Sequence, residues 1–388
     1  MSSRVAAPVA AAVTSDGILS GAFTTRLRTV LKPFAIYVAS RLLVMVTMLV
    51  ETAATNRSLG DGISRWDSRW YLLAVTHGYP SHLPMVNGHV TGNTIAFFPG
   101  LPLVIRGLSA ATGMSFFSAG VILSLAGGLG ATLGVWALVR RYAGTGAADG
   151  AAAIFAFYPG AFVFNLIYSE GLMITAAAFG LLALMRRRWV TAGLLGAVAT
   201  ATSPVSVVFV LSAAWSAFFA IKERREWKAV AAVVIAPLGA IAYIVWLWAH
   251  TGTLGAFPRT ERGGWKSYLS IRYPAKLIGS YFAHPFSSNA TTTLLFFGAI
   301  VVVIAAVIAI RDRQPSVLLI YGIAAGVLAL LTVPVGPRPR IILDAFPLVM
   351  AVGVHCARGH KFALLMILSI GLLVALTAYE VGSWSVFP

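Results

Sequence analysis

Long apolar runs alternate with short polar segments along almost the whole chain. Most runs are about 17–22 residues long, which is the length that crosses the hydrocarbon core of a bilayer as an α-helix. They are continuous and lack the period-2 alternation of barrel strands, so they predict helices. An all-α polytopic integral membrane protein with about eleven transmembrane helices is expected. The runs are residues 33–50, 117–139, 148–165, 171–185, 190–203, 205–221, 228–249, 293–310, 315–333, 341–355 and 362–381.

Basic residues gather in short clusters between the runs, and such clusters mark the cytoplasmic side of a membrane. The cluster before the first run predicts a cytoplasmic N-terminus, and Arg140-Arg141 bring the end of the second run inside. Residues 51–116 then form a first outer loop and residues 250–292 a second one. Residues 1–32 are predicted to be a disordered cytoplasmic segment ahead of a single transmembrane domain over residues 33–388.

The composition supports a multi-pass protein of the cell membrane. Of the 388 residues, 59% are hydrophobic and only 11% are charged, whereas soluble proteins carry about a quarter charged residues. The net charge of +17 would otherwise suggest nucleic acid. Because the basic clusters lie between apolar runs, membrane lipids are the expected partners and nucleic acid is not.

A polar island, residues 64–71, follows the first apolar run and lies on the predicted outer side. It places Asp67 between two tryptophans, Trp66 and Trp70, and beside Arg69. A partly desolvated carboxylate of this kind can accept a proton from a sugar hydroxyl, so Asp67 is the candidate catalytic base. The alternative is an interfacial helix cap flanked by tryptophan membrane anchors.

The first outer loop is predicted to contain two helices that lie along the membrane surface. Residues 63–75 have one apolar side, while Asp67 and Arg69 point elsewhere. Residues 93–106 are apolar but carry Pro99 and Pro102, so an interfacial helix fits them better than a span.

Other polar residues on the outer side are candidates for binding substrate. Tyr168 and Glu170 form a turn at the start of a helix, where Glu170 either holds the acceptor or a divalent metal or only favours the helix dipole. Arg338 and Arg340 lie in a Pro/Gly-rich turn, where they suit a lipid phosphate or ordinary lipid headgroups.

The second outer loop mixes cations with aromatic residues, among them Arg259, Glu261 and Lys266. This mixture suits a sugar-phosphate pocket, and a solvated loop is the alternative. His77 and His82 show no metal-ligand spacing with another His, Cys or acid. No cofactor is therefore assigned with certainty, and a divalent metal stays open.

Three motifs together resemble the PIG-V family of mannosyltransferases, in its bacterial branch. They are Arg65-Trp66-Asp67, His77-Gly78-Tyr79 and the run from Ala96 to Leu103 that contains Phe-Phe-Pro-Gly-Leu-Pro. A later Tyr168-Ser169-Glu170 is also similar. Two positions depart from the family pattern: Trp70 stands where a histidine is frequent, and the segment around Ser203 lacks an arginine.

The resemblance implies a GT-C-like fold and an inverting transfer of mannose from polyprenyl-phosphate-mannose, with Asp67 as general base. It implies an acceptor that is a cell-envelope glycolipid or lipoglycan, met on the outer face of the plasma membrane. The residues expected to bind substrate are Trp66, Arg69, Trp70, His77, Tyr79, Tyr168, Glu170, Arg259, Lys266, Arg338 and Arg340.

Two other classes of function remain open at this point. A transporter or flippase for a lipid-linked sugar would be expected to carry ionisable residues at mid-membrane, and the runs look nearly free of them away from their ends. A non-catalytic subunit of an envelope-assembly complex would tolerate changes at Asp67 and Glu170.

Overall fold

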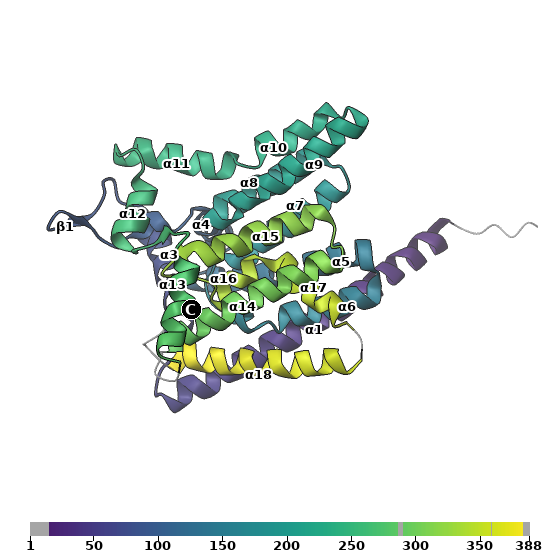
Figure 1. Cartoon of the computed structure of the whole chain (residues 1–388), viewed down its shortest axis with the longest axis horizontal. Coiled ribbons are helices and arrows are strands. Elements are labelled where there is room, and N and C mark those ends of the chain that lie inside the picture. The colour runs from purple at the N-terminus through teal and green to yellow at the C-terminus, as the bar shows by residue number, and fades with distance from the viewer. Residues whose placement is uncertain (1–14, 286–289, 358, 383–388) are drawn as a thin grey trace, which may run out of the picture.

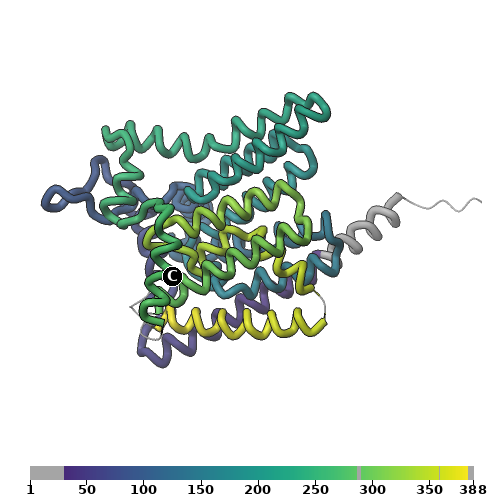
Figure 2. The backbone as a smooth tube through the Cα atoms, in the orientation of Figure 1, coloured from purple at the N-terminus to yellow at the C-terminus, as the bar shows by residue number. Residues whose placement is uncertain are grey.

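The computed structural model describes residues 15–285, 290–357 and 359–382, and helices make up nearly all of this part (Figure 1; Figure 2). The predicted class, an all-α polytopic membrane protein, is confirmed. Strands are limited to two short antiparallel pairs in the described residues. They are β1 (Met85–Val86) with β2 (His89–Val90), and β3 (Tyr268–Leu269) with β4 (Thr332–Val333).

Six helical segments of the described chain are long and apolar enough to cross a membrane. They are residues 30–54 of α1 (Ser15–Ala54), α5 (Phe116–Ala143), η3 with α9 (Pro204–Val207, Val208–Arg224), η4 with α10 and α11 (Trp227–Ala229, Val230–Ile235, Leu238–Thr251), α14 (Ala290–Arg311) and α18 (His360–Gly382). A bent pair, α6 (Thr145–Ala156) and η2 (Pro159–Asn165), makes a seventh if it is one span. Four shorter apolar helices are α7 (Glu170–Met185), α8 (Trp189–Thr202), α15 (Ser316–Leu331) and α17 (Phe346–His355).

Every predicted apolar run coincides with one or more of these helices, but their lengths do not establish the predicted count of about eleven spans. The N-terminal prediction differs from the structure. Helix α1 already begins at Ser15, so residues 15–32 are helical rather than disordered. Residues 1–14 lie outside the described residues.

The first loop contains α2 (Leu59–Ile63), α3 (Asp67–His77), η1 (Thr94–Ala96) and α4 (Gly100–Thr112). The two expected helices exist, but both begin later than predicted. The chain turns at Trp66, whose φ of 53° is left-handed, so α3 starts at Asp67. Pro99 caps α4 and Pro102 falls in its first turn, where a missing N–H costs no helical hydrogen bond.

Helices α5 and α7 run parallel and pack closely through small residues at the centre of the bundle. A Cβ on Gly127 would lie 2.8 Å from the backbone of Gly171, and one on Gly134 would lie 2.7 Å from Ala178. Because the helices are parallel, Arg140 in the last turn of α5 and Arg186 after α7 lie at the same end of the bundle. Glu170, the first residue of α7, lies at the other end.

Arg41 corrects the expectation that the apolar runs are nearly free of ionisable residues, because it lies in the middle of the first run and is 6% exposed. Its guanidinium donates to the carbonyl oxygens of Ala156, at 2.8 Å, and Ala161, and to Oδ1 of Asn165 at 2.9 Å. These acceptors lie where α6 and η2 meet at a 73° bend. Arg41 thus satisfies carbonyls that the broken helix leaves without helical partners.

Candidate active site

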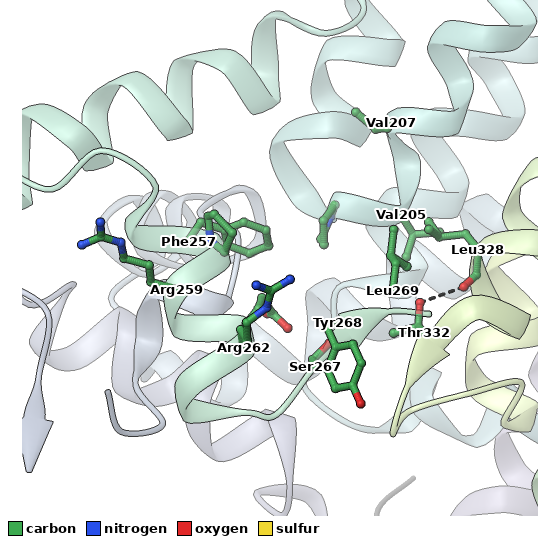
Figure 3. A pocket seen from close by; sticks show the side chains of 13 residues that line it. Val205, Val207, Phe257, Arg259, Arg262, Ser267, Tyr268, Leu269, Leu328 and Thr332 are labelled. Carbon is green, nitrogen blue, oxygen red and sulfur yellow. Dashed lines mark hydrogen bonds between the residues drawn. The ribbon is translucent and has the colours of Figure 1, made fainter. Parts of the chain in front are cut away.

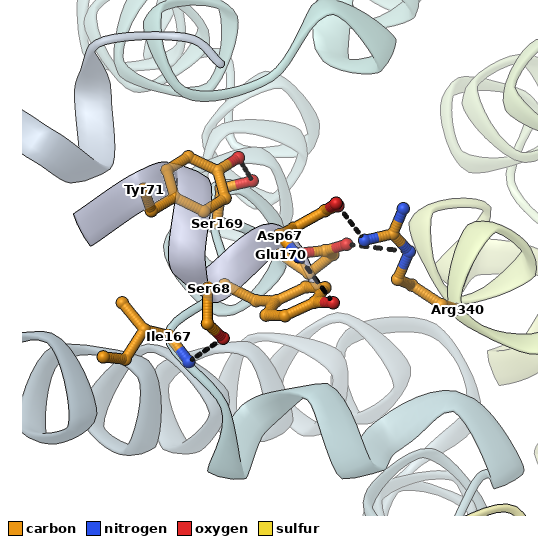
Figure 4. Close-up of polar contacts among 8 residues, drawn as sticks. Asp67, Ser68, Tyr71, Ile167, Ser169, Glu170 and Arg340 are labelled. Atoms are coloured by element: carbon orange, nitrogen blue, oxygen red, sulfur yellow. Dashed lines mark hydrogen bonds and ion pairs between the residues drawn. The ribbon is translucent and has the colours of Figure 1, made fainter. Parts of the chain in front are cut away.

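Asp67, Glu170 and Arg340 meet at one end of the bundle, although they come from three distant segments (Figure 4). Arg340 Nη1 donates to Asp67 Oδ2, and Arg340 Nε lies 3.7 Å from Glu170 Oε1. The side chains are 29% exposed for Asp67, 9% for Glu170 and 13% for Arg340. One guanidinium therefore bridges two acids, and Asp67 is the member most open to a bound molecule.

The position of Asp67 follows from the start of α3. Trp66 is the capping residue, and it makes no side-chain capping bond. The Asp67 backbone N–H donates to the Tyr168 hydroxyl at 3.3 Å, and its carboxylate accepts from Arg340. The left-handed Trp66 has an uncommon conformation for a bulky residue. The carboxylate is thus paired across the bundle and does not cap its helix, which disfavours the cap alternative.

Glu170 is held by the segment that links η2 to α7, and this segment is anchored to α3. Ser68 Oγ accepts from the Ile167 N–H at 3.1 Å, and the Tyr71 hydroxyl donates to Ser169 Oγ at 2.7 Å. Figure 4 shows these contacts beside the ion pairs. The Arg340 guanidinium also lies 5.1 Å from the centre of the Tyr168 ring.

The two arginines are positioned by α16 (Pro339–Asp344), which follows a rigid turn. A Cβ on Gly160 would lie 2.3 Å from the Pro339 carbonyl oxygen, so α16 rests directly on η2. Burial by itself lowers the pKa of Arg340, but Asp67, Glu170 and Tyr168 outweigh it and raise that pKa well above its ordinary value. Arg340 is therefore cationic at every physiological pH.

The two arginines predicted on the outer side, Arg338 and Arg340, lie beside protein acids and not only beside solvent or lipid. Arg340 has ion-pair partners in Asp67 and Glu170. Arg338 is 7% exposed, and burial, followed by the charge of Arg340, lowers its pKa while Glu380 opposes this shift. Both arginines therefore lie among acids, with Arg340 in two ion pairs and Arg338 in the electrostatic field of Glu380.

Two buried acids close to the cluster escaped the sequence-based assignment, Asp344 and Glu380, both 4% exposed. Asp344 lies one helical turn after Arg340, and its Oδ1 is buried without a hydrogen-bond partner among the described residues. Both could have been identified from the sequence as acids inside apolar runs, since such residues in membrane helices tend to be functional.

A groove of about 690 Å³ lies on the side of α12 (Ala256–Gly264) that faces η3 and α15 (Figure 3). Its wall is mostly apolar, with Val205, Leu269 and Leu328 among the lining residues, and Arg259 and Arg262 add cations. Arg259 is thus placed as a candidate binding residue, whereas Lys266 is exposed and does not line this groove.

Glu261 also lines the groove and was not among the predicted binding residues. Burial raises the pKa of Glu261 to about 7, while a hydrogen bond with Ser267 lowers it and the charge of Asp67 raises it. Trp265, which follows α12, packs on Trp70 of α3 and so joins the helix beside the groove to the helix that begins with Asp67. A polar residue in a loop of cations and aromatics gave no sequence signal that singled it out.

A second cavity, of about 520 Å³, lies along α2 and the start of α3, and its lining includes the residues that flank Asp67 in the sequence. It contains the predicted residues Trp66, Arg69 and Trp70. Trp70 also packs edge-on against Trp265, with ring centres 5.0 Å apart, and stacks on Phe97 at 6.0 Å. Trp70 therefore forms one wall of an aromatic cluster at this cavity. Its lining is Arg57, Asp61, Ser64, Arg65, Trp66, Arg69 and Trp70.

His77 and Tyr79 are not brought to the acid cluster. His77 is exposed at the far end of α3 from Asp67, about 15 Å along the axis at 1.5 Å per residue. Tyr79 donates to the Phe97 carbonyl at 2.8 Å and packs against Tyr243. These contacts give Tyr79 a structural role in joining the first loop to α11.

Across residues 15–285, 290–357 and 359–382, no three His, Cys, Asp or Glu side chains gather closely enough to hold a metal ion. Arg340 already lies between the carboxylates of Asp67 and Glu170. A divalent cation there would meet a fixed guanidinium charge, so these residues do not fit one.

The model of glycosyltransferase family 87 matches residues 98–334, which is more than half of the chain. This range includes Glu170 and Glu261 and ends before Arg340, while Asp67 precedes it. No curated protein sequence matches the chain.

Among solved structures, ArnT from Cupriavidus metallidurans bound to undecaprenyl phosphate is similar with a TM-score of 0.49 and 16% identity, over 82% of this chain and 60% of that chain. The oligosaccharyltransferase of Archaeoglobus fulgidus in the apo form is similar with a TM-score of 0.47 and 14% identity, over 90% of this chain and 56% of that chain. The chain thus spans about six tenths of the length of these structures.

Proposed function

Because the chain belongs to glycosyltransferase family 87, we propose that it is a membrane glycosyltransferase of GT-C type that transfers mannose from polyprenyl-phosphate-mannose to a cell-envelope glycolipid or lipoglycan. The single observation that carries this proposal is the bridge between Asp67, Arg340 and Glu170. It combines a partly open carboxylate with a buried permanent cation at one end of a bundle of apolar helices.

Asp67 acts as the general base in this proposal. Its carboxylate takes the proton of an acceptor hydroxyl, and the oxygen attacks C1 of the donor sugar while the bond from C1 to the phosphate oxygen breaks. Attack opposite the leaving phosphate inverts the configuration at C1. Arg340, together with Arg338, stabilises the negative charge that grows on the lipid phosphate.

The groove beside α12 fits the lipid part of the donor. Its apolar wall suits a polyprenyl chain, and Arg259 and Arg262 supply cations for a phosphate. The cavity lined by Trp66, Arg69 and Trp70 lies along α2 and the start of α3, on residues that flank Asp67 in the sequence. We assign it to the acceptor, whose sugar rings pack well against tryptophan.

The motifs around Asp67 support mannose as the transferred sugar and a relationship to the PIG-V family. The pattern of basic clusters along the chain supports an active site on the outer face of the membrane. A transporter is disfavoured, because the ionisable residue deepest in the first helix, Arg41, is fully engaged with backbone and amide oxygens.

Membranes that contain the protein are incubated with radiolabelled polyprenyl-phosphate-mannose, and the labelled glycolipids are separated. We expect transfer by the wild type and by Glu223→Gln, whose acid is exposed in the last turn of α9 and lines neither the groove nor the acceptor cavity. Asp67→Asn should show no transfer at equal expression. Full transfer by Asp67→Asn would refute the assignment of Asp67 as the base. Transfer from a polyprenyl-phosphate donor of another sugar, without transfer from polyprenyl-phosphate-mannose, would refute the assignment of the donor.

A further inference from the structure

A cavity of about 760 Å³ lies at the opposite end of the bundle from Asp67. It is enclosed by two turns, one between α7 and α8 and one between α9 and η4. Since α7 separates it from Glu170 by 16 residues, the two sites are about 24 Å apart along the helix axis. The cavity is lined by Arg186, Arg187, Trp189, Arg225, Glu226, Trp227 and Lys228.

The lining carries four cations and one acid, and the acid is already paired. Arg187 forms an ion pair with Glu226, which ties the two turns together. In the described part of the chain, no carboxylate lies within ion-pair distance of Arg186, Arg225 or Lys228. Three cations therefore converge on one cavity without a protein counter-charge, and an anion would balance them.

The surroundings point to the head of a lipid rather than a soluble anion. The cavity lies where apolar helices end, and Trp227 is 69% exposed there, as expected of a side chain at a membrane interface. Next to the cavity, α8 and α10 expose apolar side chains, including Leu194 at 56% and Val234 at 58%. Acyl chains below an anionic head would cover these faces.

We propose that this cavity binds the headgroup of an anionic phospholipid in the membrane leaflet opposite the active site. Arg186, Arg225 and Lys228 contact the phosphate, and Trp227 packs against the glycerol region. Basic pockets at the ends of membrane helices are suited to such headgroups. The proposal does not depend on the identity of the transferred sugar or of the acceptor.

The test is native mass spectrometry of the purified full-length protein with added phosphatidylglycerol or phosphatidylcholine. The wild type should retain phosphatidylglycerol preferentially, and Arg225→Gln/Lys228→Gln should lower that preference at least about tenfold. The matched control, Arg140→Gln/Arg141→Gln, removes two cations from the same end of the bundle outside this cavity and should keep the preference. Arg225→Lys/Lys228→Arg keeps both charges and should bind as the wild type does.

Unchanged preference in Arg225→Gln/Lys228→Gln would overturn the proposal, and so would an equal loss in the Arg140/Arg141 control. Glycerol phosphate is added as a soluble competitor. Displacement of the lipid at equal concentration would show a site for a soluble anion and would contradict the assignment to a membrane lipid.

Discussion

The two ends of α7 both carry clustered charge, but they differ in burial and in the origin of their partners. At the first residue, the Glu170 side chain is 9% exposed and shares Arg340 with Asp67. At the other end, Arg187 pairs with Glu226, and these side chains are 39% and 33% exposed. One end holds Glu170 and Arg340 nearly out of contact with water, while the other keeps both partners of its ion pair partly exposed.

This difference separates a candidate reaction centre from a surface feature. Burying three charged groups costs free energy that only close pairing offsets. Such a cluster, with the Asp67 side chain 29% exposed, supports the proposed reaction centre. An exposed ion pair costs little free energy to form and contributes little to stability. The charges at the far end of α7 are therefore suited to setting membrane orientation and contacting lipid.

The largest effect in this comparison is expected for Arg340→Gln. It leaves two carboxylates without their cation, and breaking a buried pair in this way costs about 3–5 kcal/mol. Transfer should also fall about 100- to 1000-fold, because the charge that stabilises the leaving phosphate is lost. Thermal unfolding in detergent and initial rates measure the two effects. Arg340→Lys keeps the charge and should restore much of the stability but little of the rate; equal stability of Arg340→Gln and wild type would contradict the buried bridge.

Glu170→Gln should have the next largest effect. The amide keeps the size of the side chain but no longer attracts Arg340 Nε, now 3.7 Å from Glu170 Oε1. A small displacement of Arg340 relative to Asp67 should lower turnover about 10- to 100-fold. Rates of Glu170→Gln, Arg340→Lys and the double variant give the coupling between the two sites. Strictly additive losses would mean that Glu170 does not act through Arg340.

A smaller, pH-dependent effect is expected at Glu261. Its pKa of about 7 lies above the ordinary value of 4.5, so folding favours the neutral carboxyl. Its contribution is full below about pH 4.5 and is lost as pH rises through 7, on the order of 2–3 kcal/mol in total. The difference in melting temperature between wild type and Glu261→Gln should therefore change by a few °C between pH 4.5 and pH 8. A difference that is independent of pH would show that Glu261 does not titrate in this range.

The smallest effect is expected at the other end of α7. Arg187→Gln breaks the exposed pair with Glu226, and such pairs contribute about 0–1 kcal/mol. Turnover should stay within about twofold of the wild type, since α7 separates this pair from Glu170 by its full length. A loss of rate as large as that of Glu170→Gln would remove the distinction between the two ends.

The apolar runs were sufficient to predict the helices, because bilayer-length hydrophobicity is a local property of the sequence. Helix α1 starts earlier than predicted because residues 15–32 extend the helix of the first apolar run, and adding turns to an existing helix is far easier than nucleating one. Arg41 is a single cation inside an apolar run and is therefore visible in the sequence. Its role could not be predicted, because the bend that it supports is a tertiary feature.

The site was predicted only in part. Asp67 and Glu170 could be named from local motifs, but their shared partner is 273 residues away from Asp67, and no local pattern reports such a contact. Arg340 was predicted to bind a lipid phosphate, whereas its nearest partners in the structure are protein acids. His77 and Tyr79 were selected by motif, yet the length of α3 and the packing on Tyr243 keep them away from Asp67.

The most direct test of the central claim separates donor binding from transfer in Asp67→Asn. Purified wild type and variant are titrated with polyprenyl-phosphate-mannose, and the sugar transferred in a single turnover is measured on the same samples. We predict a donor affinity within about threefold of the wild type and a loss of transfer of at least about 1000-fold, since a base acts on the acceptor and not on the donor. Equal losses of affinity and transfer, or transfer at the wild-type rate, would contradict it.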